Sequence, residues 1–283
     1  MDKRTMLALL LILVVFWISS EFIWKRNQPV PPAKENVTAT QTEQIQETTS
    51  TEPVQTENVT EIVVQTLEQD VDINDDIILE NDVFKLRFSN LGAVLKAIYL
   101  KEFTQNDKET IVNLIPQGKE ILGTKLTLLT GNVSNLNSVA FQYNMEENGI
   151  VFTTLTQFGA IEKSYYITNN YQLDMQIKIE SEDELASYEI DLNSGIADTE
   201  EYLKMKSRDY KIVSQVDNVI TKTTLAKLNK NNKEMKGQVD WAAIKSKYFA
   251  IAIMPDDLID ADRLSAFSND DSPAMNLSIN TDR

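Results

Sequence analysis

The chain has 283 residues with 27 basic and 43 acidic side chains, a formal net charge of −16 at pH 7. This acidic balance argues against a nucleic-acid-binding protein, which would carry a basic face. The absence of cysteine excludes disulfides and thiolate metal sites, and the absence of histidine removes the commonest general base and the commonest metal ligand. We therefore expect a non-enzymatic protein with no cofactor and no metal site.

Residues 1–26 are predicted to form a membrane anchor. Thr5–Trp24 contains a single charged residue, Glu21, and as a helix it would span roughly 30 Å, the thickness of a bilayer core. A cleaved secretory signal is the alternative, but a cut after Ser19 or Ser20 would leave a bulky residue three positions upstream. Lys3 and Arg4 flank the run on one side and Lys25 and Arg26 on the other, and Trp17 and Trp24 lie toward its second end. Side chains of these kinds are enriched at membrane interfaces.

Residues 27–76 are predicted to form an acidic disordered linker. The segment has no aromatic residue and no glycine, and Lys34 is its only basic residue against eleven carboxylates. Such a composition cannot bury enough apolar surface to offset the entropy of ordering the chain, and its excess charge favours extension.

The short N-terminal tail and the large acidic part of the chain after the anchor favour an N-terminus inside the cell, with the part after the anchor outside.

Residues 77–283 are predicted to form one all-β domain. Phe84, Leu86 and Phe88 alternate with Lys85 and Arg87, the pattern of a half-buried strand. Further runs of this kind are 94–100, 125–129, 139–143, 150–156, 161–167, 172–179, 188–192, 210–213, 219–225, 248–254 and 275–279. About a dozen strands with no alternating helices indicate a large antiparallel β-sandwich rather than an α/β fold.

Three groups of side chains within this domain are candidate sites. Residues 201–250 hold eleven basic and five acidic side chains; they could contact anionic lipid or an acidic partner, but a polar connection with its tip at 229–232 is the simpler interpretation. Trp241, Tyr248 and Phe249 are expected to fill the core, with a peptide- or sugar-binding face as the alternative. The aspartates at 256, 257, 260, 262, 270 and 271 lack the glycine and glutamate of a calcium loop and are expected to lie in a solvated loop.

Several stretches resemble YidC-type membrane protein insertases, and they occur in the order found in that family. The opening residues 1–5, followed by a leucine-rich run, resemble the family's N-terminus. The remaining stretches are 84–100 with the turn glycine Gly92, 113–116 with Pro116, 163–175, and 239–255 with Trp241, Tyr248, Phe249 and Pro255. The last of these resembles an aromatic strand that ends in proline.

The resemblance implies a protein of the bacterial inner membrane that assists insertion of proteins into the bilayer, alone or with the Sec translocon. The implied partners are the lipid bilayer, Sec translocon components and nascent membrane proteins. The implied fold of residues 77–283 is a mutarotase-like supersandwich in the periplasm. The family's five-helix insertase core has no counterpart after Trp24, so we expect an incomplete insertase whose domain lacks its last strands.

Two rival functions remain open. One is a stand-alone, membrane-tethered module that binds carbohydrate or peptide. The other is mutarotase-like sugar chemistry, which in the enzymes of similar fold uses histidine with a carboxylate. Because the chain has no histidine, a lysine, tyrosine or glutamate would have to substitute for it.

Overall fold

The computed structural model describes residues 61–64, 66, 71–181, 185–256 and 259–281. The predicted anchor 1–26 lies outside these residues. The described chain forms 19 β-strands, a 3-10 helix η1 (Leu136–Ser138) and the short helices α2 (Lys206–Asp209) and α3 (Leu225–Leu228). In this part of the chain, no helix has both the length and the apolar character needed to cross a membrane. The prediction of an all-β fold is confirmed.

The strands form four sheets, and every pairing is antiparallel except that of β1 with β7. The long sheet has the order β1 (Glu61–Ile62), β7 (Val133–Asn135), β6 (Gly123–Leu128), β12 (Leu185–Leu192), β19 (Ser272–Asn280), β18 (Ala261–Asn269) and β15 (Lys233–Lys236). The β2–β5 sheet consists of β2 (Ile77–Glu80), β3 (Phe84–Ser89), β4 (Val94–Thr104) and β5 (Ile111–Asn113). The β8–β11 sheet has the order β11 (Leu173–Ser181), β10 (Gly159–Ile167), β9 (Gly149–Thr156) and β8 (Gln142–Glu146). The β13/β16 sheet has the order β14 (Val219–Thr224), β13 (Lys211–Val216), β16 (Val239–Lys245) and β17 (Ala250–Ile253).

The β2–β5 and β8–β11 sheets pack face to face through aromatic side chains. The predicted alternation of β3 is confirmed, because Phe84, Leu86 and Phe88 are all buried. The ring of Phe88 lies 4.8 Å from that of Tyr165 on β10 and 6.1 Å from that of Phe152 on β9, centroid to centroid. Tilted ring pairs at these separations stabilise a core beyond the area they bury.

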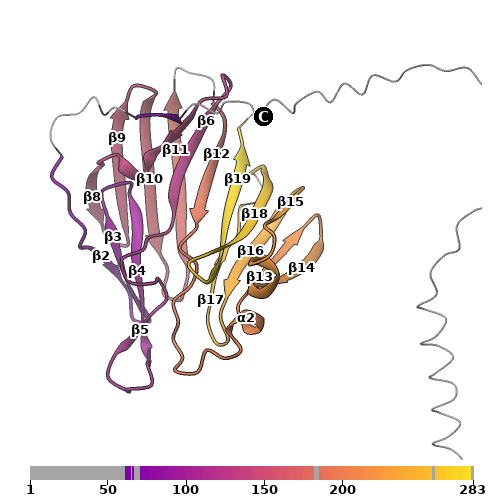
Figure 1. Ribbon diagram of the computed structural model, residues 1–283. Helices are drawn as coiled ribbons and strands as arrows, with labels where there is room; N and C mark the ends of the chain where they lie inside the picture. Colours follow the sequence, from indigo (N-terminus) through magenta and orange to yellow (C-terminus); the bar gives the residue numbers. More distant parts are fainter. Residues whose placement is uncertain (1–60, 65, 67–70, 182–184, 257–258, 282–283) are drawn as a thin grey trace, which may run out of the picture. The chain divides into compact units, whose positions relative to one another are not determined.

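The β13/β16 sheet packs on the part of the long sheet that holds β18 and β19, and β13 and β16 contact these two strands (Figure 1). The long sheet also joins the β2–β5 sheet, because Leu95 and Ile121 exchange backbone hydrogen bonds of 3.0 and 2.9 Å. Buried apolar residues of all four sheets belong to one continuous core.

Several strand boundaries differ from the sequence prediction. Residues 239–255 form a hairpin of β16 and β17 rather than one strand, because the chain turns back between Ser246 and Phe249, where the Ser246 N–H donates to the Phe249 carbonyl (2.9 Å). Residues 139–141 follow the helix η1, and the strand begins only at Gln142. The strands β2, β5, β7, β15 and β18 were not predicted, and β1 lies within the segment predicted as a linker.

Candidate functional site

A lysine lies at the centre of the domain. Lys163 occupies an inward position of β10 between Ile161 and Tyr165, and its relative exposure is 0%. Its ammonium donates to the carbonyl oxygen of Gly92 at 3.0 Å and to that of Leu122 at 2.8 Å. One side chain of the β8–β11 sheet therefore binds the turn between β3 and β4 and the segment that leads into β6.

Both carbonyls belong to left-handed residues. Gly92 has φ +75° and Leu122 has φ +65°, conformations that turn a carbonyl out of the regular sheet ladders and leave it in need of a donor. Gly92 also approaches Asn137 closely: a Cβ at this position would lie 2.9 Å from the Asn137 Cα and 3.0 Å from its carbonyl oxygen. The family-motif residue Gly92 is thus required for its backbone conformation and for its lack of a side chain.

Two carboxylates act electrostatically on this lysine. Asp191 of β12 is 2% exposed and accepts a hydrogen bond of 3.1 Å from the side-chain amide of Asn137. Gly123 makes room for both, because a Cβ there would lie 2.2 Å from the Asp191 carboxylate and 2.4 Å from the Asn137 amide nitrogen. Glu120 is the second carboxylate, and the hydroxyl of Ser194 donates to its backbone carbonyl. Desolvation raises the pKa of the Glu120 carboxyl, an effect that the nearby Lys96 opposes.

Lys163, Asp191, Glu120 and Asn137, with the two carbonyls that Lys163 binds, form what we call the polar cluster. This cluster is suited to holding the fold rather than to catalysis. Burial lowers the pKa of Lys163 to about 7, although Asp191 and Glu120 favour its charged form. Burial also raises the pKa of the Tyr165 hydroxyl, which stays protonated and donates to the carbonyl of Ala93 at 2.7 Å. A lysine with such a pKa could act as a base, but its ammonium is inaccessible and already binds two carbonyls.

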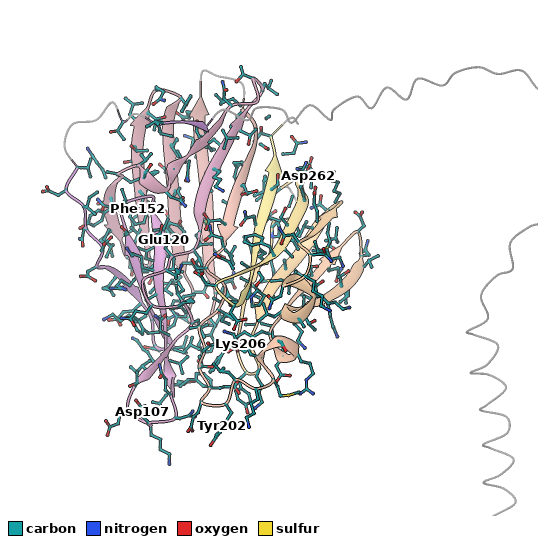
Figure 2. All side chains as sticks on the ribbon, in the orientation of Figure 1. Asp107, Glu120, Phe152, Tyr202, Lys206 and Asp262 are labelled. Atoms are coloured by element: carbon teal, nitrogen blue, oxygen red, sulfur yellow. The ribbon has the colours of Figure 1, made fainter. Side chains whose placement is uncertain are left out.

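An exposed apolar patch, which we call the end patch, lies at one end of the domain. Three segments contribute to it: the β4–β5 hairpin, the loop before α2 and the β16–β17 turn. Figure 2 shows Tyr202 of the loop at the same end as Asp107 of the hairpin. The exposed apolar side chains of the end patch are Phe103, Ile111, Tyr202, Leu203, Met205 and Tyr248.

Specific contacts hold these segments together. The ring of Phe103 meets that of Phe249 edge to face, with centroids 5.5 Å apart. The ammonium of Lys247 lies 3.3 Å from the Glu200 carboxylate and 4.6 Å from the ring centroid of Tyr248. These contacts join the β4–β5 hairpin and the loop before α2 to the β16–β17 turn.

The three aromatic side chains predicted to fill the core differ in how deeply they are buried. Trp241 is half-buried, and its indole N–H donates to the side-chain carbonyl of Gln215 at 3.2 Å. Phe249 is half-buried and packs against the core. Tyr248 is 67% exposed, so its placement in the core was wrong. Its position at the tip of the β16–β17 turn directs the side chain to solvent.

The two motif prolines are both half-buried. The carbonyl of Pro116 accepts from the N–H of Lys119 at 3.0 Å in a turn, and Pro255 follows the end of β17. Neither proline can donate a backbone hydrogen bond to the polar cluster, since proline has no N–H. The anchor residues Lys3, Arg4, Trp17, Trp24, Lys25 and Arg26 lie outside the described residues.

The basic zone is spread over several elements of the fold, and the aspartate group forms no metal-binding cluster in the described chain. The interpretation of 201–250 as a polar connection holds only for 229–232, which link α3 to β15, because β13, β14, α3, β15 and β16 occupy much of the rest. Asp270 and Asp271 form the β18–β19 turn and pair with Lys119 and Lys206 at 2.6 and 3.5 Å. Asp257 lies outside the described residues, within which no three acidic side chains converge as a metal site requires.

The four packed sheets define a β-sandwich of a known class. A galactose mutarotase-like protein from Lactobacillus casei has a similar structure, with a TM-score of 0.50 and 13% sequence identity. The match covers 74% of this chain and 87% of the other. At this identity the similarity shows the fold alone, and it confirms the predicted mutarotase-like sandwich.

The sequence matches the YidC periplasmic domain family over residues 76–279, and the chain therefore belongs to that family. The membrane protein insertase YidC of Geotalea uraniireducens is 25% identical over 90% of this chain, and that of Haemophilus influenzae strain PittEE is 26% identical over 90%. The matches cover 49% and 48% of these relatives, so the chain spans about half their length. The resemblance to YidC-type insertases is confirmed.

Sequence reasoning missed both the polar cluster and the end patch. A lysine among the inward residues Ile161, Tyr165 and Ile167 was the available signal for the cluster, since a charge on the apolar face of a strand needs a buried partner. No such signal existed for the end patch, because its three segments come together only in the fold.

Proposed function

We propose that this chain supplies the membrane-anchored periplasmic part of an inner-membrane protein insertase. The observation that carries the proposal is the match of residues 76–279 to the YidC periplasmic domain family. The predicted anchor places the domain outside the cytoplasm, with the N-terminus inside. In this position the domain would help proteins to insert and fold in the inner membrane, alone or with the Sec translocon.

The domain acts by binding rather than by chemistry in this proposal. The chain has no histidine, and its most perturbed lysine is sealed in the core with two carbonyl partners. An assay of sugar anomerisation with the purified chain provides the direct test. Activity well above the spontaneous rate would contradict the proposed role and favour the mutarotase alternative.

The end patch is the surface proposed to contact partners. Tyr202 and Tyr248 are 76% and 67% exposed, and tyrosine is enriched at protein interfaces because it combines an apolar body with a polar tip. Contiguous exposed apolar side chains mark interaction sites more often than chance. The proposed partners are Sec translocon components and nascent membrane proteins.

Site-specific photo-crosslinking in membranes tests these partners. A photoreactive amino acid replaces Tyr202 in the end patch or, as a matched control, Tyr143 on the edge strand β8, which is 40% exposed. We expect the Tyr202 position to form adducts with a Sec component or a nascent membrane protein at least several times more often than the Tyr143 position. Equal yields at the two positions, or adducts only with secreted soluble proteins, would contradict the proposal.

The rival function, a tethered carbohydrate- or peptide-binding module, gives a different result in the same experiment. Its ligands would be recovered without any membrane protein, and depletion of the chain would leave membrane insertion unchanged. Labelled insertion of a model inner-membrane protein after depletion therefore separates the two functions.

A further inference from the structure

The strand β11 forms an open edge. It runs for nine residues and, among the described residues, pairs only with β10. The pairing runs from Gly159↔Ser181 to Ile167↔Leu173 with no shift of register. Long, regular edges of this kind present a row of free backbone donors and acceptors to any chain that can pair with them.

The backbone register shows which residues of β11 face outward. The N–H of Thr168 donates to the carbonyl of Gln172 at 3.4 Å, and on the other side of β10 the N–H of Ile167 donates to Asn148 at 2.9 Å. Because hydrogen-bonded positions alternate in antiparallel pairs, the even residues of β11 bond to β10. The backbone groups of the odd residues, from Leu173 to Ile179, point away from the sheet.

The side chains of β11 alternate between the two faces. The odd residues Leu173, Met175, Ile177 and Ile179 are half-buried on the core face, whereas the even residues Asp174, Gln176, Lys178 and Glu180 are exposed. β15, an edge of the long sheet, carries a lysine at each end and is only four residues long, a common protection against edge pairing. β11 has no proline, no bulge and no inward charge.

We propose that β11 pairs antiparallel with β11 of a second copy of this chain, about a two-fold axis at Gln176. In this register Asp174 faces Lys178 of the partner subunit, and Lys178 faces Asp174 of the partner subunit. Both pairs are opposite in charge, as cross-strand neighbours prefer. The half-buried apolar stripes join across the axis, and the two β8–β11 sheets become one continuous sheet.

Other symmetric registers of the same edge are less favourable. An axis at Ile177 sets Asp174 against Glu180, and an axis at Asp174 or Lys178 sets a charge against its own copy; like charges placed opposite each other are destabilising. An axis at Met175 sets Asp174 against Gln176 and so forms no ion pair between these residues. The sequence of β11 thus favours one partner and one register, as closed two-fold assemblies require of a self-complementary surface.

Cysteine crosslinking of the full chain in its membrane tests the register. The natural chain has no cysteine, so Gln176→Cys introduces a single thiol directly opposite its own copy. We expect oxidation to give a disulfide-linked dimer of two copies. The matched control is Gln142→Cys on β8, the other edge of the same sheet and also exposed. Equal dimer yields from the two variants, or a disulfide from the Gln176→Cys variant to a different protein only, would overturn the proposal.

Charge exchange in the Gln176→Cys background provides a second test. Asp174→Lys and Lys178→Asp each place like charges opposite each other twice, and we expect either to reduce the dimer yield by roughly tenfold. The double exchange restores opposite charges and should restore the yield. The substituted positions are all exposed, so folding is expected to persist, and circular dichroism checks it. A yield that does not respond to the single exchanges would overturn the register.

Discussion

At the scale of single residues, Lys163 is the most unusual side chain of the domain. Its ammonium is buried, yet it binds the carbonyls of Gly92 and Leu122 and lies in the field of Asp191. Removing one member of such a cluster leaves the others buried without a partner, which costs more than the cluster contributes as a whole. The lysine is therefore expected to matter for stability rather than for chemistry.

Replacing Lys163 with methionine, which has a similar length but no charge, tests this expectation. We expect Lys163→Met to lower the free energy of unfolding by roughly 3 kcal/mol, because two carbonyls and a carboxylate lose their donor or countercharge. Lys222→Met is the control, since Lys222 is exposed on β14 and its loss should change stability by about 0.5 kcal/mol or less. Urea unfolding followed by circular dichroism measures both; equal effects would contradict the structural role.

The pH dependence of stability follows from the same lysine. Its pKa falls from 10.5 to about 7 on folding, so between these values the unfolded chain binds more protons than the folded one. Stability from this group therefore rises with pH across that window and is lowest below pH 7. Relative to Lys163→Met, the wild type should gain up to about 1.4 kcal/mol per pH unit between roughly pH 7.5 and 9.5. Parallel pH profiles of the two proteins would refute this.

At the scale of secondary structure, the sequence predicted strands where polar and apolar residues alternate. β3 was found because Phe84, Leu86 and Phe88 repeat every second residue. β16 was not recognised as a separate strand because Ala242, Ala243 and Ile244 are consecutive and all buried, which removes the alternation. β15 was interpreted as part of a polar connection because an edge strand rich in lysine has the composition of a loop.

Gly92, in the turn between β3 and β4, and Gly118, in the turn between β5 and β6, form a matched pair of glycines for a second test. Gly92 and Gly118 have nearly the same φ, +75° and +73°, but a Cβ at Gly118 would meet nothing within 4 Å. Gly118→Ala should therefore cost only the left-handed strain, about 1 kcal/mol. Gly92→Ala should cost roughly 2 kcal/mol more, because its Cβ would collide with the backbone of Asn137. Equal losses in urea unfolding would show that this close approach is not tight.

At the scale of the whole molecule, the end patch brings together three segments that are far apart in the sequence. The mutarotase-like arrangement of the sheets could be expected from the resemblance, but the resemblance gave no indication that Phe103, Tyr202 and Tyr248 lie at one end. Sequence reasoning assigned Tyr248 to the core because aromatic residues near β-strands usually lie there. Only the position of the β16–β17 turn in the assembled domain exposes it.

The double variant Tyr202→Ser, Tyr248→Ser separates binding from stability. Both rings are largely exposed, so we expect the free energy of unfolding to change by about 1 kcal/mol or less. If the end patch contacts translocation partners, co-purification of those partners with the full chain should fall several-fold. Tyr143→Ser on β8 serves as the control, and an unchanged level of partners in the double variant would remove the end patch from the proposed function.

The position of Lys163 also has a consequence for how the domain opens. Its hydrogen bonds connect three of the four sheets at one point, so none of the three can detach while the ammonium keeps both carbonyls. The three sheets are then expected to unfold as a single cooperative unit rather than as separate subglobal pieces. In native-state hydrogen exchange, the amides of β3, β6 and β10 should share one opening free energy, and Lys163→Met should split it into several.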